Sequence, residues 1–277
     1  MQELSRYAGD GGLKAKKATP FRLDLPEGIL TFETSLPAAP ARVSHIVRNL
    51  FPFCDRVNEL GAGIAAQFGK KISCGPGCGV CCRQMVPLSP PEAVHVAEVL
   101  QSLPDKRKEI ISERFTAART LLKQNGLIEK IMKLYMCSAS DEEILAVNRE
   151  YFDLHITCPF LENGSCSIYH ERPSRCREYS VLSPQSLCED PFDTRIRRLP
   201  VTVRLCESIT YIWASLTGKP PRIIPLIDAP FWIENNQDDL MLTVDNPEPL
   251  MKAVLEHACY GANKRAKAKM AKMKSGE

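Results

Sequence analysis

The chain has 277 residues, of which 44% are hydrophobic, and a formal net charge of +3. This length and apolar content suffice to bury a core, so the chain does not need a metal merely to become compact. Residues 1–10 carry charges instead of an apolar signal-peptide core, and no apolar run reaches the ~18 residues of a membrane helix. The composition therefore predicts a cytoplasmic protein without a membrane partner.

The sequence predicts four successive segments along the chain. Residues 1–40 predict a loosely ordered arm, because Gly, Pro, Lys and Ala recur there without sustained periodicity. We expect residues 41–215 to form one helical cysteine-cluster domain, with its motif region at residues 74–190. Residues 216–260 are expected to be an extension packed on that domain. Residues 261–277 are a basic tail with six Lys or Arg and one acidic residue, but without the aromatic residues that would indicate nucleic-acid binding.

Helical signals dominate outside the cysteine segments. Apolar residues follow helical spacing from Val43 to Ile64, with an expected kink at Pro52. Ser89 with Glu92 three residues later predicts a capped helix start. Further helices are expected from Asp105, after the Ser140 and Glu143 capping box, over residues 207–216 and after Asn246-Pro247. We therefore predict a mostly α fold with one small β-hairpin, built as a single cysteine-rich, metal-centred domain.

The distribution of the cysteines is the main functional signal. Seven of the 12 cysteines lie in two short segments, residues 74–82 and 158–176. In a reducing compartment such clusters are more often metal ligands than disulfides. The candidate ligands are Cys74, Cys78, Cys81, Cys82, Cys158, Cys166 and Cys176. Cys54 and Cys137 have no cysteine near them in sequence and are expected to be structural.

The first segment has the composition of a metal-binding loop. Three glycines and a proline separate its cysteines, which allows tight turns that bring several sulfurs together. Cys78 and Cys81 have the spacing of a thiolate knuckle on one tetrahedral ion. Side chains of adjacent residues diverge in an extended backbone. One of Cys81 and Cys82 would then serve a second metal or remain a free thiol.

The second segment predicts a β-hairpin around Asn163-Gly164. We expect a three-residue loop that includes Ser165, because this register would place Cys158 and Cys166 on one face of the hairpin. Cys176 follows in a turn or helix with a proline near its start and is expected to point to the same side.

Cationic residues flank both segments. They are Arg83, Arg172, Arg175 and Arg177. A divalent ion with four thiolates carries a net charge of about −2, so neighbouring guanidinium groups would offset the cost of burying it. Zinc and iron–sulfur clusters both accept four thiolates, so both remain open. Seven cysteines exceed one mononuclear site, which favours a cluster or two metal sites over a single structural zinc.

These motifs resemble the YkgJ-like cysteine-cluster proteins, a family named for its CxxCxxCC motif and described as zinc- or iron-chelating. The resemblance covers residues 74–190 and rests on Cys74, Cys78, Cys81, Cys82, Arg83, Leu88-Ser89, Glu92-Ala93, Cys158-Pro159-Phe160-Leu161, Cys166-Ser167-Ile168-Tyr169, Arg172-Pro173 and Cys176-Arg177. Cys188 lies where family members often carry a further cysteine. The resemblance implies binding of zinc or iron, including iron in a 4Fe-4S cluster, and does not imply a physiological role.

One branch with a similar motif, the flagellin lysine N-methylases, implies an alternative function. Those proteins resemble iron–sulfur enzymes that use S-adenosylmethionine, so the alternative is an S-adenosylmethionine-dependent protein methyltransferase. No glycine-rich strand-to-helix turn marks a methyl-donor site in this sequence. The two functions differ in what they require. A binding module needs only a saturated metal site, whereas the methyltransferase needs an open cavity beside the cysteines.

The spacing of Cys74, Cys78 and Cys81 also matches radical S-adenosylmethionine enzymes. In those enzymes the residue before the third cysteine is usually aromatic, and the motif follows the first strand of a large barrel. Here that residue is Val80, and the motif follows a predicted helix. Fold and motif context therefore disfavour this third interpretation.

Overall fold

The computed structural model of the chain describes residues 18–136 and 139–275. The helices are α1 (Val43–Arg48), α2 (Phe51–Gln67), α3 (Pro90–Ser102), α4 (Asp105–Gln124), α5 (Leu127–Met136), α6 (Asp141–Asp153), α7 (Ser174–Glu178), α8 (Leu205–Thr217), α9 (Ala229–Glu234), α10 (Gln237–Leu240) and α11 (Pro247–Ser275). The strands are β1 (Ala18–Leu25), β2 (Gly28–Ser35), β3 (Ala41–Arg42), β4 (Pro87–Leu88), β5 (Leu161–Glu162), β6 (Ser165–Cys166), β7 (Ile224–Pro225) and β8 (Thr243–Val244). The predicted mostly helical fold class is confirmed. Cys137 lies outside the described residues.

The strands pair into small antiparallel sheets. In the described residues there are four of them, each two-stranded: β1–β2, β3–β8, β4–β7 and β5–β6. Two of these pairs, β3–β8 and β4–β7, connect the first third of the chain to its last third. The sequence predicted only the β5–β6 hairpin.

The β1–β2 hairpin shows that residues 18–35 are ordered, which differs from the loosely ordered arm expected for residues 1–40; residues 1–17 of that arm lie outside the described residues. Its two strands of eight residues pair along their whole length. Phe21, Leu23 and Leu25 alternate along β1 and are buried, and Leu30 and Phe32 do the same on β2. Alternation with a period of two is the signature of a half-buried strand. The apolar residues of the arm carried that signature despite the surrounding Gly and Pro.

The capped helix starts are confirmed. Ser89 caps α3 and Ser140 caps α6, each in a reciprocal capping box with the glutamate three residues later. The expected kink at Pro52 is a break between two helices, since α1 ends at Arg48 and α2 begins at Phe51. Pro52 lies in the first turn of α2, where its missing N–H group removes no helical hydrogen bond.

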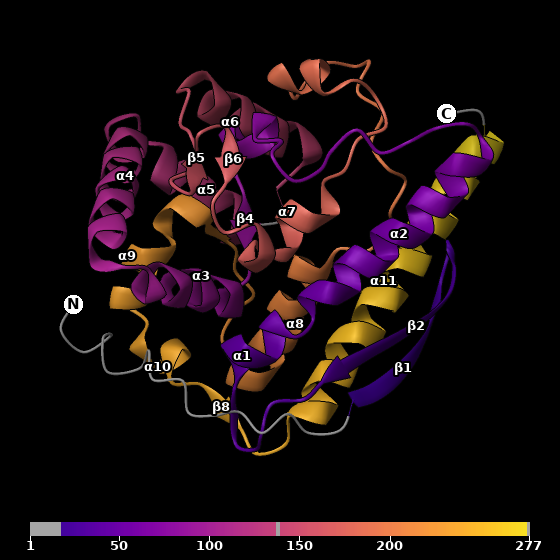
Figure 1. The fold of residues 1–277 in the computed structure, drawn as a ribbon, viewed down its shortest axis with the longest axis horizontal. Coiled ribbons are helices and arrows are strands. Elements are labelled where there is room, and N and C mark those ends of the chain that lie inside the picture. Colours follow the sequence, from indigo (N-terminus) through magenta and orange to yellow (C-terminus); the bar gives the residue numbers. More distant parts are fainter. Residues whose placement is uncertain (1–17, 137–138, 276–277) are drawn as a thin grey trace.

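Two main apolar clusters build the interior. The first joins the β1–β2 hairpin to α1, α2, α8 and α11, and the second joins α3, α4, α5 and α6 to the β5–β6 hairpin. Figure 1 shows α11 behind α2 along one side of the molecule and α3 to α6 on the other. Helix α7 contacts both α2 and α8. Cys176 lies on α7, and Cys158 and Cys166 pack against the second cluster, so the second cysteine segment contacts both clusters. No described helix is long and apolar enough to cross a membrane.

Candidate metal centre

The second cysteine segment forms the predicted hairpin, but with a different loop. Leu161 pairs with Cys166, which leaves Asn163 and Gly164 at the tip of a two-residue loop. The prediction of a three-residue loop is wrong. The φ angles of Asn163 and Gly164 are 50° and 76°, as a type I′ turn requires and as Asn-Gly favours. Cys158 precedes strand β5, so the alternation of side chains along the strand does not determine which way the Cys158 side chain points.

The first cysteine segment packs directly on this hairpin. Cys158 N donates to Cys82 O at 2.7 Å, which joins the two backbones. Gly79 lies against the hairpin loop: a Cβ atom at this position would lie 2.5 Å from Gly164 O and would overlap the side chain of Leu161. Only glycine allows this approach, so Gly79 sets the separation of the two cysteine segments.

The start of the first segment is held by the stretch that follows α7. Ser73 N donates to Val181 O at 2.9 Å, and Val181 N donates to Cys74 Sγ at 3.3 Å. Cys188 lies in the same region, where burial and the nearby Cys74 raise the pKa of its thiol. Cys188 is buried and is a further thiol beside the first segment. Its sequence context contains no metal-binding motif, and Cys188 is not among the seven candidate ligands.

Glu92 connects α3 to α7 and so positions Cys176. Its Oε1 atom accepts hydrogen bonds from Ser174 N at 2.9 Å and Ser174 Oγ at 2.6 Å. Its Oε2 atom accepts from Ser89 N at 3.0 Å and Ser89 Oγ at 2.7 Å. The side chain is fully buried. One carboxylate therefore completes the capping box of α3 and also fixes the first turn of α7, where Cys176 lies.

Replacing Glu92 with glutamine is expected to lower the free energy of unfolding by about 2–3 kcal/mol, because an amide has one acceptor oxygen for four buried donors. Urea unfolding measures this loss. Glu143→Gln is the matched control, because Glu143 has the same capping position in α6 but is exposed. We expect a clearly smaller loss for Glu143→Gln, and equal losses would contradict the connecting role of Glu92.

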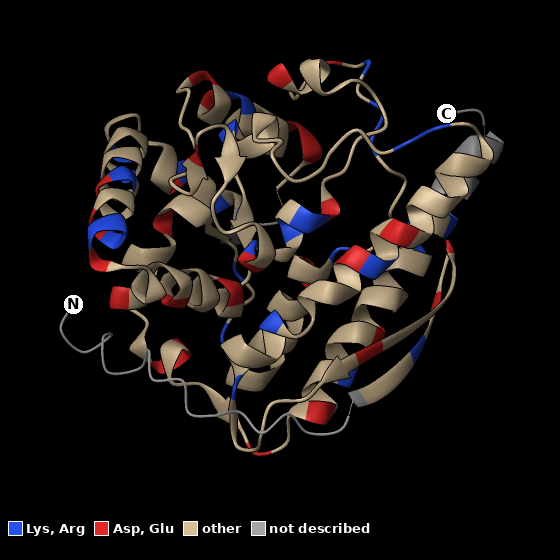
Figure 2. Ribbon diagram, in the orientation of Figure 1, with Lys and Arg blue, Asp and Glu red and all other residues tan. Residues whose placement is uncertain are grey.

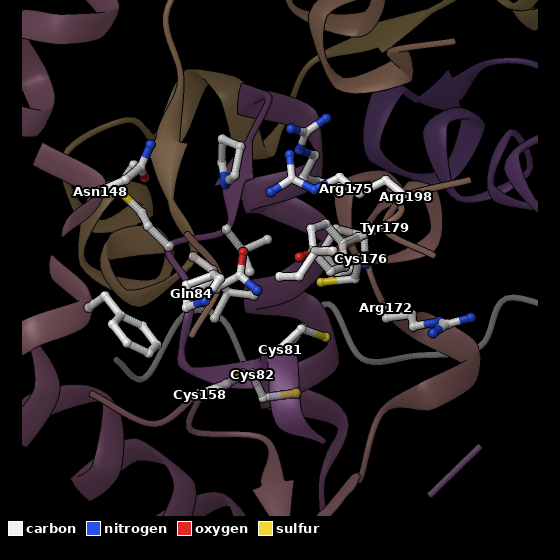
Figure 3. A pocket seen from close by; sticks show the side chains of 18 of the residues that line it. Cys81, Cys82, Gln84, Asn148, Cys158, Arg172, Arg175, Cys176, Tyr179 and Arg198 are labelled. Atoms are coloured by element: carbon white, nitrogen blue, oxygen red, sulfur yellow. The ribbon is translucent and has the colours of Figure 1, made fainter. Parts of the chain in front are cut away.

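Six of the seven candidate ligands line one cavity of about 720 Å³. They are Cys78, Cys81, Cys82, Cys158, Cys166 and Cys176. Figure 3 labels Cys81, Cys82, Cys158 and Cys176 among them. These residues come from the first segment, from both ends of the β5–β6 hairpin and from α7. Cys74 is not part of the lining. The fold thus brings together cysteines that are up to about a hundred residues apart, as the two-segment interpretation required.

Four of the six thiols that line this cavity have a raised pKa. Burial raises the pKa of Cys158, Cys166 and Cys176 above the usual range of a thiol. A hydrogen bond to Cys82, together with burial, raises the pKa of Cys81. A metal ion binds the thiolate, so it would displace the thiol protons as it enters.

The donor chemistry of the cavity fits a thiolate-bound metal. Thiolates are the ligands of structural zinc and of iron–sulfur clusters. In the described residues, no three His, Cys, Asp or Glu side chains are arranged to hold a metal ion as they stand. Coordination at this site therefore requires side-chain rotation, which the shared cavity leaves room for.

The arginines differ in their relation to the cavity. Arg172 and Arg175 line it, whereas Arg83 is exposed and is not part of its lining. Arg177 is only 7% exposed and donates to Asp55 Oδ2 at 2.6 Å, which makes it a structural cation. Figure 2 shows Lys and Arg residues on α7 and in the loop after it. Two of the four arginines are thus placed to offset the charge of a metal centre.

Residues 73–195 match the model of the CxxCxxCC family, whose description is "Putative zinc- or iron-chelating domain". The matched segment is less than half of the chain and contains both cysteine segments. The resemblance to the YkgJ-like family is confirmed over this range. None of the curated proteins and none of the solved structures matches the chain.

The segment that matches the family model does not line the cavity alone. Ile196, Arg198 and Leu226 also line it and lie beyond residue 195. Val181 and Arg198 pair in an isolated β-bridge, which holds this stretch beside the matched segment. No sequence motif marks Arg198 as a site residue, because only the folded chain brings it to the cavity that the cysteines line.

Proposed function

We propose that the chain binds zinc or iron through thiolates of its two cysteine segments. The ligands are drawn from Cys74, Cys78, Cys81, Cys82, Cys158, Cys166 and Cys176. The observation that carries the proposal is the convergence of six of these cysteines on one cavity. Their number exceeds one four-thiolate site, which favours an iron–sulfur cluster or two metal sites. The proposal places the protein in the cytoplasm, where thiols stay reduced.

X-ray absorption at the zinc and iron edges tests this proposal. The protein is purified without an affinity tag and without oxygen, so that no metal is introduced and no thiol is oxidised. We expect a sulfur shell around the metal at about 2.3 Å. A shell of oxygen and nitrogen alone would mean that the metal is adventitious and that the cysteines are not its ligands.

A second candidate function is an iron–sulfur, S-adenosylmethionine-dependent protein methyltransferase. The cavity favours it, because a closed four-thiolate zinc needs no open space of about 720 Å³ beside its ligands. Equilibrium dialysis of labelled S-adenosylmethionine against the anaerobically reconstituted protein tests it. Binding that depends on the cluster is the expected result, and no binding, or equal binding to the metal-free protein, would contradict this function.

A further inference from the structure

We propose that the cavity beside the cysteines binds an organic oxyanion, a carboxylate or phosphate group carried on an apolar body. This site goes beyond metal binding, because its recognition groups are not thiols. It is formed by cations, by hydrogen-bond donors without partners and by apolar residues of the cavity wall.

Four arginines line the cavity: Arg149, Arg172, Arg175 and Arg198. Three of them stack on aromatic rings. Arg172 lies 3.8 Å from the ring centroid of Tyr169, Arg149 lies 4.2 Å from that of Phe192, and Arg198 lies 5.2 Å from that of Tyr179. Stacking fixes the plane of a guanidinium group and leaves its N–H edge free for a carboxylate or phosphate.

These cations are poorly neutralised by the protein. Among the described residues, Arg175 is the one lining arginine with an acidic partner: its Nη1 atom lies 3.6 Å from Glu178 Oε2. Of the two lining carboxylates, Asp193 is paired with Arg195 at 2.6 Å. The cavity therefore presents a net positive charge.

Donors without partners provide an independent argument. Gln84 Nε2, Arg172 Nε and Tyr179 Oη are buried and have no hydrogen-bond partner among the described residues. All three residues line the cavity, and Figure 3 shows Gln84 and Tyr179 beside the cysteines. Leaving a donor buried and unpaired is costly. Protein atoms cover these three donors, so a ligand with several acceptor oxygens would satisfy them after a small movement of the side chains in the cavity wall.

The remaining wall favours an organic ligand over inorganic phosphate alone. Ile144, Leu145 and Phe152 of α6 are part of the lining. The volume of about 720 Å³ lies within the range of small-molecule sites. An apolar body placed against α6 would bury these side chains while its oxyanion meets the arginines.

Titration calorimetry of the full chain, as purified with its metal, tests the proposal with phenyl phosphate and benzoate. We expect both anions to bind at least about tenfold more tightly than benzyl alcohol, their neutral counterpart. Comparing the two anions shows which oxyanion the site prefers. Equal binding of the anions and benzyl alcohol, or no binding of either anion, would overturn the proposal.

Variants away from the cysteines separate this site from the metal centre. Arg149→Met and Arg198→Met should each weaken phenyl phosphate binding by about fivefold or more while metal content stays unchanged. Gln84→Met should weaken it too while raising thermal stability, because it removes an unpaired buried donor. Arg204→Met is the control, since Arg204 pairs with Glu207 at 2.9 Å and does not line the cavity. Unchanged binding in both arginine variants would overturn the proposal.

Metal content, measured on the same samples, distinguishes this proposal from the proposed function. A chain that binds phenyl phosphate but takes up no metal supports the oxyanion site and contradicts metal binding. A metal-loaded chain that does not bind either anion contradicts the oxyanion site alone.

Discussion

Cys78→Ser is expected to lose most of the bound metal and to unfold at a lower temperature. Cys78 lies in the first cysteine segment and lines the shared cavity. A serine hydroxyl does not replace a thiolate as a zinc or iron ligand. Metal coordination contributes to folding free energy, because the unfolded chain has no preformed site, and the loss is expected to reach several kcal/mol. Metal content per chain and thermal unfolding measure the two effects.

Cysteines outside the cavity are the controls for this experiment. Cys54 is 1% exposed in α2, as predicted for a core residue, and Cys259 lies on α11. Cys54→Ser and Cys259→Ser should keep the full metal content, although Cys54→Ser lowers stability by placing a hydroxyl in the core. Equal metal loss in Cys54→Ser and Cys78→Ser would contradict the division between ligand and core cysteines.

Gly79→Ala is expected to lower the free energy of unfolding by about 1–3 kcal/mol and to reduce metal content. The added Cβ would lie 2.5 Å from the carbonyl oxygen of Gly164, a backbone atom that has little freedom to move. The first segment must then separate from the β5–β6 hairpin, which pulls Cys78 and Cys81 away from Cys158. Urea unfolding and metal analysis of the purified variant test both effects.

Gly75→Ala is the matched control, because Gly75 belongs to the same cysteine segment. A Cβ at Gly75 would meet no atom within 4 Å, and its φ angle is not in the left-handed region. We expect little change in stability or metal content. A Gly75→Ala variant as impaired as Gly79→Ala would show that flexibility of the loop, and not close packing on the hairpin, accounts for the effect.

Local signals predicted local structure well. The capping residues Ser89 and Ser140 each have their partner three residues away, so the sequence contains the complete motif. The prediction of a three-residue loop in the second segment was wrong. It was based on the expected position of Cys158 and Cys166 on one face of the hairpin, although Asn-Gly strongly prefers a two-residue type I′ turn. The cysteines still line one cavity, because Cys158 lies before the strand and is oriented by its hydrogen bond to Cys82.

Long-range contacts could not be predicted from the sequence. Glu92 was predicted as a capping residue, but its hydrogen bonds to Ser174 span 82 positions. Arg177 was grouped with the cations of the site, yet its partner Asp55 is 122 positions away and holds it in a structural role. Arg198 lines the cavity only because the fold places its segment next to Val181. Which of the seven cysteines bind metal stays a prediction.

Metal and acid-labile sulfide analysis, with a visible absorption spectrum, is the decisive measurement on tag-free protein purified without oxygen. We expect at least about one zinc or iron per chain, given the thiolate donors that converge on one cavity. Iron with matching sulfide and a broad visible band would establish a cluster and make S-adenosylmethionine binding the next assay. Stoichiometric zinc in colourless protein would assign the centre a structural role. A chain that contains neither zinc nor iron would contradict the proposed metal centre.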